Sequence, residues 1–171
     1  AGGKSIHHRL DEDLGSIIPE GSTTVLVMFD GLGSHQLTHP FATDLARADA
    51  GPLDAPFPTT TTVSLTTVAT GRTATEHGVL GYTLIDPEFA GPINTIHLRS
   101  VYGDELGIDP DLFLPGDRLW ERLAAEGIEP ISVQPANFSD TPLTRMLYRG
   151  ARFEPYHHPA EIAEVTMDLA R

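Results

Sequence analysis

The chain has no cysteine, and basic residues are scarce. Without cysteine it can form neither a disulfide nor a thiolate zinc site, and it has no cysteine nucleophile. Its 24 acidic residues outnumber its 11 basic residues, and the formal charge is −13. This charge argues against nucleic acid or an anionic membrane as a partner. A small anionic substrate is still compatible with it, because a bound cation can invert the local field.

Long apolar runs are also absent. No stretch is long enough to span a bilayer, and residues 1–5 lead into polar sequence instead of the apolar core of a signal peptide. We therefore expect a cytoplasmic location and no membrane partner. The composition does include 40% apolar residues over 171 positions, which is enough for one globular domain with a real core.

The clearest strand is predicted at residues 23–30. Residues 25–29 are all apolar, as in a parallel strand that is covered on both faces. Asp30 follows directly, and Gly31 and Gly33 let the backbone turn tightly beside its carboxylate. Ligands of α/β folds bind at this carboxyl edge of the sheet. The alternative is an ordinary Asp-Gly turn, but such turns usually join strands of alternating pattern.

A threonine-rich stretch, residues 58–71, predicts a sharp turn followed by a short helix. Pro58 favours an extended approach, the threonine hydroxyls can cap a helix start, and Gly71 ends the helix. A hydroxyl in the first helical turn lies beside unpaired N–H groups, where an anion such as phosphate is stabilised. The alternative is a β-strand or turn, because threonine is β-branched.

The remaining elements are expected to complete an α/β fold with a parallel sheet. Residues 34–39 predict a helix start on which His35 and His39 lie on a solvated face. Asp117 is expected to cap the helix before Gly127, so that helix, glycine and strand form half of a βαβ unit. The expected helices are 44–48, 119–124, 144–148 and 161–169, the expected strands are 93–98 and 128–133, and residues 86–114 are expected to form a loop or lid excursion.

These motifs form an ordered set: an apolar strand ending in Asp30, a Pro-Thr-rich turn, a helix ending in Gly71, and then His77-Gly78. In this order they resemble the type I phosphodiesterase/nucleotide pyrophosphatase family of the alkaline phosphatase superfamily. Residues 25–33 and 57–80 carry most of the resemblance. It implies an alkaline-phosphatase-like fold, with a largely parallel central sheet flanked by helices. It also implies two divalent metal ions, usually zinc, at the carboxyl edge of that sheet.

The resemblance also implies roles for particular residues. Asp30 falls at the position of a metal-ligating aspartate, and Thr61 falls at that of the nucleophile, which also contacts the metal. The implied reaction runs through a phospho-threonine and hydrolyses a small phosphate ester or nucleotide. Thr62 is a neighbouring hydroxyl, and Ser64 stands where many members have an asparagine that contacts the phosphoryl oxygens. Both residues are expected to bind the substrate. His77 lies beside the expected site or caps a helix end.

Part of the implied metal site is missing from the sequence. The family completes its metal ligands with an Asp-x-x-x-His segment and an Asp-His pair, and neither occurs here. We therefore expect residues 1–171 to be the N-terminal part of a larger catalytic domain, with an incomplete sheet and little activity alone. Two other hypotheses stay open. One is a phosphomonoesterase, sulfatase or phosphonate hydrolase of the same superfamily, and the other is a non-catalytic binding domain that lost its metal ligands.

Overall fold

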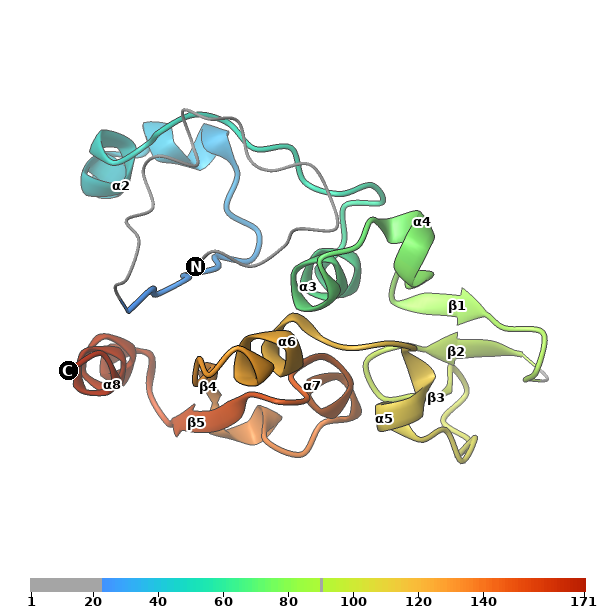
Figure 1. Ribbon diagram of the computed structural model, residues 1–171. Coiled ribbons are helices and arrows are strands. Elements are labelled where there is room, and N and C mark those ends of the chain that lie inside the picture. Colours follow the sequence, from blue (N-terminus) through green and yellow to red (C-terminus); the bar gives the residue numbers. More distant parts are fainter. Residues whose placement is uncertain (1–22, 90) are drawn as a thin grey trace. The chain divides into compact units, whose positions relative to one another are not determined.

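The computed structural model describes residues 23–89 and 91–171. The chain divides into two compact units, Ala1–Ala55 and Pro56–Arg171, and each is considered by itself. In the first unit, the described residues form three short helical elements in succession (Figure 1). These are η1 (Ser34–Thr38), η2 (Pro40–Ala42) and α2 (Thr43–Arg47). His35 and His39 are both exposed, as expected of a solvated face, and His39 caps η2 by accepting the Phe41 N–H.

The second unit contains most of the regular structure. Its helical elements are α3 (Thr61–Thr70), α4 (Ala74–His77), α5 (Pro110–Phe113), α6 (Leu119–Ala125), η3 (Ala136–Phe138), α7 (Pro142–Leu147), η4 (Pro159–Glu161) and α8 (Ile162–Leu169). Its strands are β1 (Thr83–Ile85), β2 (Pro92–Asn94), β3 (Arg99–Ser100), β4 (Ile131–Pro135) and β5 (Arg152–Tyr156). None of the described helices combines the length and the apolar character that a membrane span requires.

The strands of the second unit form two small sheets. Strands β1, β2 and β3 make an antiparallel meander, and β4 pairs in parallel with β5 (Figure 1). The parallel pair runs from Ile131 opposite Arg152 to Pro135 opposite Tyr156, and η3 and α7 connect its two strands. The helix–glycine–strand order predicted around Gly127 is found as α6 and β4, although β4 begins at Ile131 instead of residue 128. A βαβ unit is formed by β4, α7 and β5. The mixture of helices and small sheets is consistent with an α/β fold.

The central strand predicted at residues 23–30 is not found. Residues 23–29 form no strand in the described structure, and the apolar side chains of residues 25–29 are 43–67% exposed. A strand needs a hydrogen-bonded neighbour, and a doubly buried strand also needs a layer on each face. The described part of the first unit supplies neither. Among the described residues, the parallel pairing that is found joins β4 and β5.

Several predicted boundaries move. The single strand expected at 93–98 is a hairpin, with β2 ending at Asn94 and β3 starting at Arg99. The Asn94 side chain accepts the N–H groups of residues 96 and 97, so it turns the chain instead of extending it. The expected cap at Asp117 is also wrong. Arg118 is the residue before α6, and its N–H is bound by the Glu121 carboxylate at 2.8 Å.

The core of the second unit lies among α3, α7 and the segments that flank α5 and α6. Its fully buried apolar members are Ala69, Val79, Leu114, Met146 and Leu147. Leu65, Phe113, Leu143 and Tyr148 pack against this cluster. Ala69 belongs to the C-terminal half of α3, and Met146 and Leu147 belong to α7. The core therefore holds the C-terminal half of α3 in place.

A buried arginine holds the loop before α6 against the end of α7. The Arg118 side chain is 0% exposed and donates to three backbone carbonyls. Nε donates to the Met146 oxygen at 2.6 Å, Nη1 to the Gly116 oxygen at 2.5 Å, and Nη2 to the Leu114 oxygen at 2.8 Å. The bonds to Met146 and Leu114 are buried, and the guanidinium group supplies the donors that these two carbonyls need there.

Candidate active site

The helix predicted after Pro58 is present as α3. Thr60 is the N-cap residue with an extended backbone, Thr61 is the first helical residue, and Gly71 ends the helix with φ +65°. The left-handed conformation at Gly71 is the reason that glycine suits this position. The Ser64 N–H already donates to the Thr60 carbonyl at 3.0 Å. The N–H groups of residues 61–63 precede that first helical bond, as expected at a helix N-terminus.

Three threonines of α3 face the protein interior at intervals of four residues. Thr62, Thr66 and Thr70 are all buried. The Thr66 hydroxyl donates to the Thr62 carbonyl at 2.6 Å, and the Thr70 hydroxyl donates to the Thr66 carbonyl at 2.7 Å. This hydroxyl ladder satisfies polar groups inside the helix. Most of the threonines of α3 therefore lie on the face that packs against the protein interior.

Thr61 and Ser64 lie on a more accessible part of the helix. Both are partly buried, and their spacing of three residues places them on one face. The Thr62 side chain, by contrast, is 0% exposed, and its hydroxyl lies 3.4 Å from the Thr60 hydroxyl. Thr61 is thus a partly exposed residue at the positive end of the helix, whereas Thr62 is completely buried.

Asp30 lies in the first unit, in an exposed turn that continues through Gly31 with φ +72°. The structure brings Thr61, Thr62 and Ser64 together on one helix of the second unit, and Asp30 belongs to the other unit. Across the described ranges, 23–89 and 91–171, no three acidic or histidine side chains are grouped closely enough to hold a metal ion. The described residues by themselves do not fit a complete metal centre.

His77, which ends α4, is buried against α3. Its Nδ1 accepts the N–H of Val79 at 3.1 Å, and its Nε2 lies 3.1 Å from the Thr67 hydroxyl. Because Nδ1 accepts a hydrogen bond, the network assigns the proton of the neutral ring to Nε2, which donates to Thr67. Burial lowers the pKa of His77 below 6.5, and Arg72 adds to this, while Glu76 opposes it. His77 is therefore a neutral structural bridge from α4 to α3, the local hydrogen-bonding role considered from the sequence.

The His77 bridge predicts a loss of stability in mild acid. Above pH 6.5 the imidazole is neutral in both the folded and the unfolded chain. As pH falls through 6.5, the unfolded chain takes up the proton first, so the free energy of unfolding decreases until the pH lies below the lowered folded pKa. Urea unfolding at several pH values between about 8 and about 5 measures this slope.

The matched variant for this experiment is His77→Asn, whose carbonyl oxygen can still accept the Val79 N–H. We expect it to flatten the slope, whereas His97→Asn at an exposed position leaves it unchanged. An undiminished slope in His77→Asn would contradict the assignment. Glu121 does not contribute to this slope, because its hydrogen bond with Arg149 lowers its pKa below 4.5. Its contribution to the free energy of unfolding is lost only in stronger acid.

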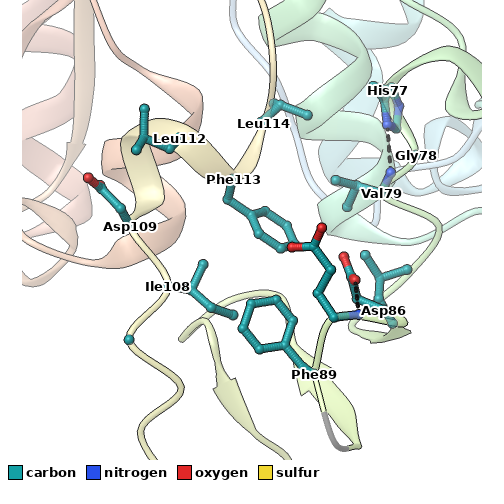
Figure 2. Close-up of a pocket in the computed structure, with 13 residues that line it drawn as sticks. His77, Gly78, Val79, Asp86, Phe89, Ile108, Asp109, Leu112, Phe113 and Leu114 are labelled. Atoms are coloured by element: carbon teal, nitrogen blue, oxygen red, sulfur yellow. Dashed lines mark hydrogen bonds between the residues drawn. The ribbon is translucent and has the colours of Figure 1, made fainter.

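His77 also lines a hollow of about 510 Å³. Figure 2 shows Phe89, Ile108 and Phe113 pointing into it, with His77, Gly78 and Val79 along one wall. Most of its lining comes from residues 86–114, the stretch expected from its Pro, Gly and Asp content to be a loop or lid excursion. Within that stretch the structure places β2, β3 and α5, and β1 directly precedes it. The scattered apolar residues that line the hollow have no periodicity, so the sequence analysis missed them.

One comparison with known proteins bears on this arrangement. The sequence model of a family described as type I phosphodiesterase / nucleotide pyrophosphatase matches residues 24–163. The matched range contains Asp30, the three polar residues of the first turn of α3, and His77. Neither a curated protein nor a solved structure matches the chain significantly.

Proposed function

The chain belongs to the type I phosphodiesterase/nucleotide pyrophosphatase family, and from this premise we propose that it hydrolyses phosphodiester or nucleotide pyrophosphate bonds through Thr61. The family match itself indicates phosphoester hydrolysis by the enzyme to which this chain belongs. The observation that carries the finer proposal is the place of Thr61, a partly exposed residue at the first position of α3 within the matched range. A small phosphate ester or nucleotide is the substrate class consistent with the family.

In the proposed reaction the Thr61 oxygen attacks phosphorus. A bond forms between Oγ1 of Thr61 and phosphorus, the bond to the leaving oxygen breaks, and the leaving group takes up a proton equivalent to the one lost by the hydroxyl. Water then attacks the phospho-threonine, which releases a phosphate product and regenerates the hydroxyl. The positive end of the α3 dipole and the first N–H groups of the helix stabilise the negative phosphoryl oxygens.

Ser64 and Thr62 have different parts in this proposal. Ser64 shares the Thr61 face, and its hydroxyl is the proposed substrate contact. The serine side chain is a shorter donor than the asparagine side chain of many members, so the type of ester is not fixed by this position. The second candidate is therefore a phosphomonoesterase, sulfatase or phosphonate hydrolase. Thr62 was also assigned to substrate binding. Its complete burial supports a role in holding the first turn of α3 instead of direct contact.

The family is generally dependent on divalent metal ions. We propose two ions, zinc in the first place, with Asp30 and Thr61 among their ligands. When bound, such ions lower the pKa of a hydroxyl and neutralise phosphoryl charge. A catalytic zinc ion usually has about three protein ligands, so two residues cannot hold a pair of ions. Because these two ligands are too few, we also propose that residues 1–171 are the N-terminal part of a larger catalytic domain. Within it, residues 86–114 are the proposed loop or lid excursion. We keep a cytoplasmic location as a further proposal.

The test uses the protein expressed from its complete reading frame and loaded with zinc. We expect faster hydrolysis of bis-p-nitrophenyl phosphate than of p-nitrophenyl phosphate, with activity lost in EDTA and restored by zinc. A clear preference for the monoester would contradict the diesterase proposal and favour the second candidate. Binding of a nucleotide without turnover of either ester would favour a non-catalytic binding domain.

A further inference from the structure

The hollow beside α5 combines an apolar floor with an acidic rim. Its volume is about 510 Å³, within the range of about 300–1,000 Å³ that is usual for small-molecule sites. The floor is made by Leu84, Phe89, Ile108, Leu112 and Phe113. The carboxylates in its lining are Asp86, Glu88 and Asp109. No lysine or arginine is among the described residues that line it.

Two aromatic rings enter the hollow from different segments. Figure 2 shows the Phe89 and Phe113 rings pointing into the same space, with the Asp86 carboxylate beside them. Phe113 packs against the core cluster, which holds its ring in place, and Phe89 is partly buried. The face of an aromatic ring carries partial negative charge and attracts a cation. Several aromatic faces around one space form the usual cage for alkylated ammonium groups.

The carboxylates are held at the rim by local hydrogen bonds. Asp86 accepts the Glu88 N–H at 2.9 Å, and Asp109 accepts the Asp111 N–H at 2.9 Å. The nearest cation to Asp109 is Arg145, at 4.0 Å, but Arg145 pairs more closely with Asp111, at 2.8 Å. Glu88 is exposed. His77, the other titratable group of the lining, adds no positive charge near neutral pH, because burial lowers its pKa.

We propose that this hollow binds a small organic cation, an alkylated ammonium group joined to an apolar or aromatic body. An anion would meet three carboxylates and no cationic side chain of the lining. A bare metal ion would need grouped ligands, and the described ranges contain no such group. An alkylated ammonium group needs no fixed ligands, because aromatic faces and nearby carboxylates attract it through space. This inference rests on the hollow alone and does not depend on phosphoester hydrolysis.

The test is calorimetric titration of the protein expressed from its complete reading frame with benzyltrimethylammonium chloride at low salt. Benzyl alcohol supplies the ring without the charge, and tetramethylammonium supplies the charge without the ring. We expect saturable one-to-one binding of benzyltrimethylammonium, with each of the other two at least about fivefold weaker. Equal binding of benzyl alcohol would show a merely apolar pocket and overturn the proposal, as would the absence of saturable binding.

Two pairs of variants locate the site. Phe89→Leu removes one aromatic face and is expected to weaken binding about fivefold, whereas Phe138→Leu, outside the hollow, leaves it unchanged. Glu88→Gln is expected to weaken binding about twofold or more, and Glu164→Gln, which makes the same charge change on α8, has no effect. Glu88 is exposed, so this variant is expected to fold like the original chain. Equal losses within either pair would overturn the proposed location.

Discussion

Replacing Thr61 with alanine is expected to lower the rate of phosphoester hydrolysis about a thousandfold or more, while the protein stays folded. The substitution removes the oxygen that attacks phosphorus, and the adjacent Thr62 hydroxyl is not expected to take its place, because the Thr62 side chain is buried. Alanine favours the helix, and the N-cap position remains Thr60. Steady-state kinetics of the complete protein measure the loss, and circular dichroism checks the fold.

Two further variants separate chemistry from structure. Thr61→Ser keeps a hydroxyl at the first position of α3 and is expected to retain measurable turnover. Thr59→Ala changes an exposed threonine before the helix and is expected to leave the rate unaffected. Mass spectrometry of the acid-quenched reaction should find phosphate on the peptide that contains Thr61. Full turnover by Thr61→Ala would show that another residue is the nucleophile, even if the enzyme class is right.

Replacing Arg118 with methionine is expected to lower the free energy of unfolding by about 3 kcal/mol or more. Methionine can fill much of the space but donates no hydrogen bond, so the buried bonds to the Leu114 and Met146 carbonyls are lost. The exposed Gly116 carbonyl keeps its bond from Arg149 Nη2, at 3.1 Å. Each buried carbonyl left without a donor costs about 1–3 kcal/mol. Part of this cost is offset, because burying the guanidinium group is itself unfavourable, as the lowered pKa of Arg118 indicates. Urea unfolding monitored by Trp120 fluorescence measures the difference.

The control for Arg118 is Arg152→Met, in β5. Arg152 pairs with Glu129 and Glu154, and its side chain is 45% exposed, so this loss is expected to cost less than about 1 kcal/mol. Arg118→Lys should fall between the two, because an ammonium group cannot reach three carbonyls in the planar arrangement of a guanidinium. If Arg118→Met and Arg152→Met unfold at the same urea concentration, Arg118 does not hold the loop before α6 to α7.

The helix at the proposed nucleophile could be predicted because its signals are local. Pro58, the threonine run and Gly71 lie within a single stretch, and each acts through the backbone next to it. The parallel β4–β5 pair could be approached in the same way from the helix–glycine–strand order. Local signals failed at residues 23–30, because an apolar run indicates that burial is needed and does not identify the neighbouring strand.

Two other features could not be found from sequence spacing. Arg118 reaches the carbonyl of Met146, 28 residues away, and nothing in the sequence marks a carbonyl as an acceptor. The hollow likewise depends on Phe89 and Phe113, which approach each other only because the β1–β2–β3 meander and α5 fold together. The roles of Asp30 and Ser64, by contrast, were taken from the family resemblance. They stay predictions that the nucleophile and metal experiments can test.

The hydroxyl ladder of α3 also bears on how this protein can change over evolutionary time. The Thr66 and Thr70 hydroxyls donate to carbonyls of their own helix, so they need no hydrogen-bond acceptor from the side chains that pack against them. Neighbouring apolar residues such as Leu143 can therefore be replaced by others of similar volume, and no buried hydroxyl loses its hydrogen-bond partner. Selection on the accessible face of α3 can then proceed almost independently of selection on its buried face, although the whole helix is only ten residues long.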